Sequence, residues 1–149
     1  MTPIATILCV SAALLVPVSV AGADTLPKDA PKCTYKVPTS VPLSSMTKKG
    51  LAVRVTCDAD ATVSSLVDMT GKLDQDWDDM HNGYIPGIAR PEDTKVKAGV
   101  PAVTHVRVTK SAAKFLRRYH RPRLRVMLGV LMPRGYYQSI DNGRHVVLR

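Results

Sequence analysis

Aromatic residues are scarce in this chain of 149 residues: five Tyr, one Trp and one Phe make up only 5% of the sequence. Any core must therefore be built mainly from Val, Leu, Ile and Ala, since hydrophobic residues still amount to 45%. No apolar run of 18 residues occurs after residue 23, which excludes a multi-pass helical membrane protein. The length suits one compact domain and is too short for two ordinary ones.

Catalytic signatures are also missing. There is no G-x-S-x-G nucleophile elbow and no glycine-rich phosphate-binding loop. The histidines are scattered, without the H-E-x-x-H or other paired-ligand spacing of metal sites: His81, His105, His120 and His145. These absences favour a protein that is not an enzyme and that needs no cofactor.

The N-terminus has the anatomy of a secretory signal peptide, which we predict over residues 1–23. Residues 4–21 are apolar and uncharged, and Ala21-Gly22-Ala23 forms a small-residue cleavage site before Asp24. Because no Lys or Arg precedes the run and its length approaches that of a spanning helix, an uncleaved membrane anchor is the alternative. Pro17 and the small-residue exit favour cleavage. Cleavage predicts a secreted protein without a membrane segment, extracellular or associated with the cell envelope.

Cysteine is limited to three residues, of which Cys9 would leave with the signal peptide. The remaining pair in an exported chain, Cys33 and Cys57, predicts one disulfide. Two isolated cysteines are too few for a metal site. In the chain-entropy model, closing this loop of about 25 residues stabilises a fold by roughly 3–4 kcal/mol.

Alternating apolar residues predict strands over five segments: 51–57, 61–69, 100–109, 123–132 and 136–149. Asp58-Ala59-Asp60 separates the first two, which predicts that they form an antiparallel hairpin. One short helix is expected over 111–119, with Ser111 as its N-cap. Residues 24–42 contain four prolines and no periodicity, as in a linker or an irregular leader strand. Short strands, turns and one disulfide predict an all-β fold, a small antiparallel β-sandwich.

The last strand is expected to direct Val146 and Leu148 inward and Val147 outward. Residues 70–93 interrupt the strand pattern with three Gly, two Pro and the only Trp. We interpret this segment as a long loop inserted at about 70–94. Long loops are more often functional than short ones, so the segment is a candidate interaction surface.

Residues 43–61, LSSMTKKGLAVRVTCDADA, resemble the opening of Ig-like modules common in secreted actinobacterial proteins: a Leu-Ser, a basic pair, Gly-Leu and an alternating Val strand that ends in Cys-Asp. Those modules carry a basic Ala/Leu-rich helical crossover at the place of Ser111–Arg118. The similarity covers most of residues 43–149 except 70–94, and Pro133-Arg134-Gly135-Tyr136 stands at the family's terminal turn. It implies an extracellular, non-catalytic Ig-like β-sandwich and transfers no functional residues.

Acidic residues are nearly absent from residues 94–149, which hold 13 basic residues and one acid, Asp141. Five arginines crowd together and can donate paired hydrogen bonds to phosphates or carboxylates: Arg117, Arg118, Arg121, Arg123 and Arg125. They are candidate ligands for an anionic wall polymer, an acidic polysaccharide or nucleic acid, of which nucleic acid is not the expected partner. The alternative is a solvated basic face without a ligand, which the habitually basic crossover of the Ig-like modules favours.

Carboxylates alternate within residues 70–93 and are candidate calcium ligands: Asp74, Asp76, Asp78 and Asp79. Counted from Asp74, however, Asp79 and Ile85 occupy the Gly and Glu positions of a twelve-residue calcium loop, so an acidic solvated loop is the alternative. Trp77 and Tyr84 are candidates for a partner-facing aromatic platform. The favoured interpretation is that Trp77 pins the segment to the body of the fold.

Two functions therefore stand as hypotheses. The first is a secreted, non-catalytic Ig-like module that contacts an extracellular protein or the cell envelope, using residues 70–93. The second is a binder of anionic polymers that uses the arginine cluster.

Overall fold

The computed structural model describes residues 30–82 and 87–149. The predicted signal peptide, its cleavage site and Tyr84 lie outside the described residues. Within them, no helix is long and apolar enough to cross a membrane. The described chain is mostly β, with its elements in this order: β1 (Cys33–Lys36), β2 (Ser40–Val41), α1 (Leu43–Lys48), β3 (Leu51–Cys57), β4 (Ala61–Met69), α2 (Lys72–Met80), β5 (Ala89–Pro91), β6 (Thr94–Val96), β7 (Ala102–Val108), α3 (Lys110–Leu116), β8 (Arg123–Leu131), β9 (Tyr137–Ser139) and β10 (Arg144–Leu148).

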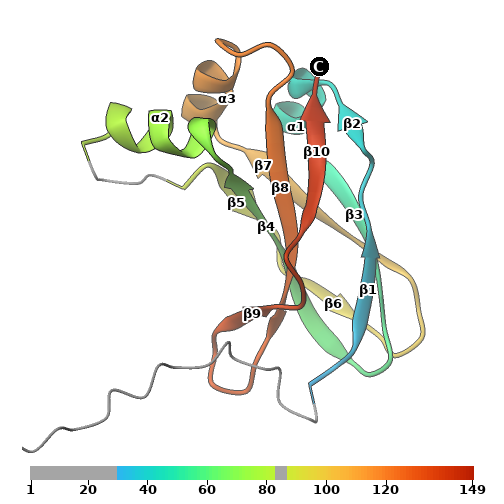
Figure 1. Cartoon of the computed structure of the whole chain (residues 1–149). Coiled ribbons are helices and arrows are strands. Elements are labelled where there is room, and N and C mark those ends of the chain that lie inside the picture. Colours follow the sequence, from blue (N-terminus) through green and yellow to red (C-terminus); the bar gives the residue numbers. More distant parts are fainter. Residues whose placement is uncertain (1–29, 83–86) are drawn as a thin grey trace, which may run out of the picture.

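The strands form two sheets that enclose one core. One sheet has four strands in the order β1-β3-β7-β5, and the other has six, in the order β2-β10-β8-β4-β6 with β9 on β8. The pairs are antiparallel except β2 and β10, which run parallel. In Figure 1, β8 and β10 lie in front and β3 and β7 run behind them.

The predicted alternation of apolar residues is what fills this core. Inward positions of both sheets are almost completely buried: Leu51, Val53, Val55, Val106, Val108, Leu124, Val126, Leu128, Val130, Val146 and Leu148. The expected orientation of the last strand is confirmed, because Val146 and Leu148 are buried whereas Val147 is half-exposed. Burial of this apolar surface is the main stabilising contribution to the fold.

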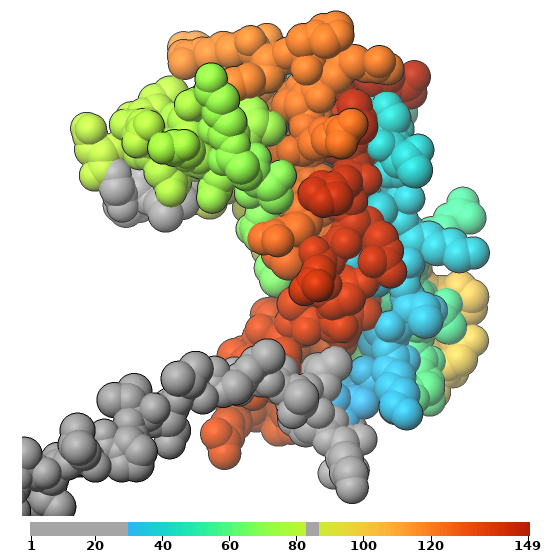
Figure 2. Space-filling view, in the orientation of Figure 1, coloured from blue at the N-terminus to red at the C-terminus, as the bar shows by residue number. Residues whose placement is uncertain are grey.

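The three described helices each lie where the chain crosses from one sheet to the other. α1 connects β2 to β3, α2 connects β4 to β5, and α3 connects β7 to β8. All three therefore gather at one end of the sheets (Figure 1). In the space-filling view, α2 in green abuts the orange α3–β8 segment at that end (Figure 2).

The predicted hairpin between residues 51–57 and 61–69 is wrong. β3 pairs with β1 and β7, whereas β4 pairs with β6 and β8 in the other sheet. The Asp58-Ala59-Asp60 connection crosses between sheets: the carboxylate of Asp58 accepts from Lys32 N (2.8 Å), and that of Asp60 accepts from Ala98 N (2.9 Å). Each strand is apolar on one face, so placing the two in facing sheets buries both faces together.

The expectation of one short helix is also wrong. α3 forms close to its predicted place, but Thr109 is the N-cap rather than Ser111, and its hydroxyl accepts from Ala112 N at 3.3 Å. α1 and α2 were not expected. The segment interpreted as a loop at 70–94 contains α2, where Leu73 and Trp77 are four residues apart on one helix face and Trp77 is buried.

The predicted disulfide is confirmed. Cys33 and Cys57 lie directly opposite each other on β1 and β3 and are bonded. The leader therefore forms a strand, β1, over Cys33–Lys36 and is not a linker there. The next strand, β2, pairs in parallel with β10 in the other sheet. This places residues 39–44 beside the end of β10, where the candidate site lies.

Gly143 occupies a position that other residues cannot fill without strain. Its φ is +86°, and an added Cβ would lie 2.8 Å from the Cγ atoms of Arg125 and Met127 and 2.9 Å from the carbonyl oxygen of Val126. Its N–H donates to Asp141 Oδ1 (2.8 Å). The glycine thus allows the turn into β10 to pack directly onto β8.

We expect Gly143→Ala to lower the free energy of unfolding by about 2–5 kcal/mol, combining about 1–2 for the left-handed backbone and 1–3 for overpacking. Gly135→Ala is the matched control, because Gly135 has a φ of +81° but no heavy atom within 4 Å of the added Cβ. Urea unfolding of both variants measures the difference. Equal losses would show that the packing against β8 relaxes without cost.

Candidate anion-binding site

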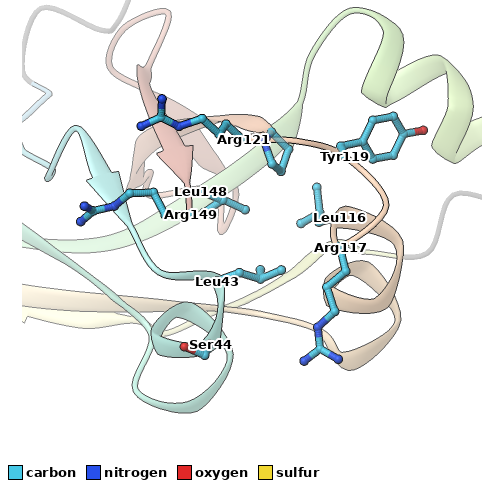
Figure 3. Close-up of a pocket in the computed structure, with 9 residues that line it drawn as sticks. Leu43, Ser44, Leu116, Arg117, Tyr119, Arg121, Leu148 and Arg149 are labelled. Atoms are coloured by element: carbon cyan, nitrogen blue, oxygen red, sulfur yellow. The ribbon is translucent and has the colours of Figure 1, made fainter.

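Four segments meet around a hollow of about 340 Å³ at the helical end of the molecule. They are the start of α1, the end of α3, the connection from α3 to β8, and the end of β10 (Figure 3). We call this feature the arginine hollow and define it by its lining residues: Leu43, Ser44, Leu116, Arg117, Tyr119, Arg121, Pro122, Leu148 and Arg149.

Main-chain hydrogen bonds hold these segments together. Leu43 N donates to the carbonyl oxygen of Arg149 (3.0 Å), and Arg149 N donates to that of Val41 (3.0 Å). Leu148 N donates to the carbonyl oxygen of Pro122 (2.9 Å), which continues the pairing of β10 with β8. The frame of the hollow is therefore built from backbone hydrogen bonds as short as those between paired strands.

The hollow combines an apolar floor with a basic rim. Leu116 and Leu148 are each 1% exposed and, with Leu43, lie between the three arginine side chains (Figure 3). Arg117, Arg121 and Arg149 are exposed. Figure 3 shows Arg121 and Arg149 extending to the same side, as expected for residues opposite each other beyond the Val147↔Arg123 pair.

Arg121 is the centre of a wider basic surface. It also lines an adjoining hollow of about 460 Å³ with Tyr119, His120 and Arg149, and another of about 360 Å³ with Arg123 on the β2 side. Its backbone has a φ of +52°, the left-handed region that a residue with a Cβ enters at a cost of about 1–2 kcal/mol. Such conformations cluster at binding sites, where the surrounding structure imposes them.

The arginines of this surface lack acidic partners in the part of the chain that the structure describes. Arg117, Arg121, Arg123 and Arg149 form no ion pair there. The ion pairs that do form use other basic residues: Lys97–Asp60, His105–Glu92, Arg125–Asp68 and Arg144–Asp141. The positive charge around the hollow is therefore not neutralised by neighbouring side chains and is available to an anion.

Tyr119 anchors the α3–β8 connection to α2. Its hydroxyl donates to Asp76 Oδ2 at 2.6 Å, and its ring lies 5.1 Å from that of Phe115. The hydrogen bond to Asp76 raises the pKa of Tyr119. One acidic residue of α2 thus positions the loop that carries Arg121.

The structure divides the predicted arginine cluster. Arg117, Arg121 and Arg123 lie on the basic surface, whereas Arg118 directs Nη1 toward Met80 Sδ (3.8 Å) and Arg125 binds Asp68 (2.9 Å). Sequence reasoning missed Arg149. Pairing the last predicted strand antiparallel with residues 123–132 would have placed it opposite Arg121.

The candidate calcium ligands Asp74, Asp76, Asp78 and Asp79 lie on a helix, α2, and not in a loop. Carboxylates two residues apart on this helix are separated by about 200° around its axis. Among the described residues, no group of three or more His, Cys, Asp or Glu side chains could hold a metal ion. Trp77 is 1% exposed and packs edge-on against Phe115 at 5.1 Å, so it pins α2 to the core as the favoured interpretation expects and does not face a partner.

Comparison of the chain with protein-family models, with curated proteins and with solved structures finds no match.

Proposed function

We propose that this protein is an exported, non-catalytic binding module that holds anionic groups of an extracellular or cell-envelope polymer at the arginine hollow. The observation that carries the proposal is the arrangement of Arg117, Arg121 and Arg149 around one hollow without acidic partners in the described part of the chain. Guanidinium groups bind carboxylates and phosphates with two parallel hydrogen bonds, which is the chemistry that such a rim offers.

The apolar floor strengthens this chemistry. Leu43, Leu116 and Leu148 provide no competing hydrogen-bond partners and reduce the water around the rim. A charged group attracted to the arginines is therefore less screened there than on an open surface. The strained backbone of Arg121 adds a second argument, since the fold maintains that conformation against its cost.

The fold assignment within this proposal is an Ig-like β-sandwich. Two antiparallel sheets around one core support it, as does the resemblance of residues 43–61 to secreted Ig-like modules. The Cys33–Cys57 disulfide supports export, because disulfides persist mainly in oxidising compartments.

Arg121→Gly separates binding from stability. We expect this variant of the chain 24–149 to bind two short anions, tripolyphosphate and digalacturonate, about tenfold more weakly, the equivalent of 1.4 kcal/mol. Its free energy of unfolding should rise by up to about 1 kcal/mol, because glycine relieves the left-handed strain. A salt series with both short anions measures the affinity, which should weaken as ionic strength rises.

Asn82→Gly is the control, because Asn82 is the other non-glycine residue with a positive φ (52°) in the described chain and lies at the end of α2, outside the hollow. It should leave the affinity for both short anions unchanged. Unaltered binding by Arg121→Gly, or binding that is insensitive to salt, would overturn the proposed function.

A further inference from the structure

The outward face of the four-stranded sheet carries a second set of basic residues. Alternate positions of β1, β3, β7 and β5 point away from the core. Their side chains are mainly small or basic, and they include Val103, which is 45% exposed: Thr34, Lys36, Ala52, Arg54, Thr56, Arg90, Val103, His105 and Arg107. We call this the basic sheet face. It shares no residue with the arginine hollow.

Like charges stand directly opposite each other on this face. Lys36 is paired with Arg54 across β1 and β3, and Arg90 is paired with Arg107 across β5 and β7. Directly opposed like charges destabilise a sheet. None of the four forms an ion pair among the described residues, and Glu92 at the β5 edge lies 4.0 Å from His105 instead. Two repulsive pairs therefore occupy solvent-exposed positions, where most residue types would fit.

The two pairs are separated by a flat stretch of sheet. Arg54 is opposite Val103, and Arg107 lies four residues further along β7, a rise of about 13–14 Å. Two strand spacings add about 10 Å across the sheet, so the centres of the pairs are about 17 Å apart on the diagonal. Val103 and the opposed residues Ala52 and His105 lie between the two pairs. The stem of Arg107 lies over Gly50, where an added Cβ would be 3.1 Å from Arg107 Cγ.

We propose that the basic sheet face binds an extended acidic polysaccharide, whose carboxylates engage the Lys36–Arg54 and Arg90–Arg107 pairs together. A carboxylate bound between the two positive side chains of a pair accepts hydrogen bonds from both and so offsets their repulsion. Thr34 and Thr56, opposite each other at one end of the face, offer hydroxyl groups to sugar hydroxyls.

The composition of the face favours a polysaccharide over two other polyanionic partners. The face carries no aromatic side chain within the described residues, whereas proteins that bind single-stranded nucleic acid stack bases on aromatic rings. Among the residues of the face, Val103 is the apolar side chain larger than alanine, and none is a Trp, Phe or Leu of the kind that inserts into a bilayer interface. The site is separate from the arginine hollow, so neither proposal depends on the other.

The test compares ligands that can and cannot reach both pairs. Binding of digalacturonate and of a long polygalacturonate fraction is measured by calorimetry for the chain 24–149 carrying Arg121→Gly, which weakens the arginine hollow. We expect the long chains to bind at least tenfold more tightly per carboxylate than the disaccharide, because the second pair is engaged at high effective concentration.

Arg54→Ser combined with Arg90→Ser removes one charge from each pair and should abolish this length advantage. The variant should fold normally and unfold at no lower urea concentration, since it relieves like-charge repulsion at exposed sites. Lys114→Ser combined with Arg134→Ser is the matched control, because it removes two exposed charges from α3 and from the segment after β8 and should keep the advantage.

Three results would overturn the proposal. They are equal binding of short and long chains, an unchanged length advantage in the Arg54→Ser, Arg90→Ser variant, and tighter binding of anionic vesicles or single-stranded DNA than of long polygalacturonate. Loss of all binding in the Arg121→Gly background would likewise reject the basic sheet face, and would leave the arginine hollow as the binding site.

Discussion

Replacing Trp77 with alanine is expected to lower the free energy of unfolding by about 3–5 kcal/mol, the range for removing a large buried aromatic side chain. Trp77 is 1% exposed and is the only Trp in the chain. Its ring contacts Phe115 of α3 with centroids 5.1 Å apart and His81 with centroids 4.2 Å apart.

Urea unfolding of Trp77→Ala and Met80→Ala provides the comparison. Met80 lies at the end of the same helix but is 42% exposed, so its loss should cost less than about 0.5 kcal/mol. A similar small loss for both variants would contradict the structural role of Trp77. Trp77→Ala should also weaken polymer binding, because α2 holds Tyr119 through Asp76 (2.6 Å) and thereby positions the loop that carries Arg121.

Because Trp77 belongs to the core, a deletion cannot test residues 70–93 as an interaction surface. Deleting residues 72–90 would remove Trp77 from the core together with β5, so loss of binding after that deletion would not identify a contact. Substituting the exposed Asp74 and Asp79 leaves the core intact. Those two positions are therefore the appropriate probes of an acidic contact surface on α2.

Removing the disulfide is expected to lower the free energy of unfolding by about 3–4 kcal/mol, because Cys33 and Cys57 close a loop of about 25 residues in the unfolded chain. The loss should be largest locally at β1, the edge strand that the disulfide joins to β3 within the four-stranded sheet. Tyr35 of β1 makes a separate contact with the six-stranded sheet. The hydroxyl of Tyr35 donates to Asp141 Oδ1 (2.7 Å) and to the carbonyl oxygen of Val126 (3.3 Å). Burial, followed by the contact with Asp141, raises the pKa of Tyr35, so this tie keeps its proton at neutral pH.

Unfolding with and without reductant isolates the contribution of the disulfide. The wild-type chain should lose stability in reductant, whereas a Cys33→Ala, Cys57→Ala variant should start lower and show no further change. Alanine is the suitable replacement because Cys57 is 1% exposed, and serine would bury a hydroxyl without a designed partner. An unchanged unfolding midpoint of the wild type in reductant would contradict the prediction.

Much of the fold could be predicted because the information is local. Alternation at Val53 and Val55, and again from Leu124 to Val130, identifies strands whose apolar side must face a core. Cysteine counting identified the Cys33–Cys57 pair because only two cysteines follow the predicted signal peptide. The four-residue spacing of Leu73 and Trp77 is a local signal of the helix α2. The glycines and prolines after residue 82 nevertheless favoured the interpretation of the whole segment as a loop.

The candidate site was predicted less well than the strands. A run of arginines between residues 117 and 125 marks a basic region, yet Arg125 pairs with Asp68 and does not line the hollow. Arg149 enters the site from the far end of the sequence, because β10 pairs with β8. The spacing of residues within 117–125 indicates neither the pairing of Arg125 with Asp68 nor the position of Arg149 in the site.

The sequence by itself determined where the main core strands lie, which cysteines pair, and that the second half of the chain is strongly basic, because each of these depends on neighbours along the chain. Only the tertiary structure decided that β3 and β4 belong to different sheets, that residues 70–93 contain α2 and β5, and that Arg117, Arg121 and Arg149 share one hollow. The physical reason is that these features arise from the burial of apolar faces by segments distant in sequence, and the alternation of a single strand does not specify which partner covers it.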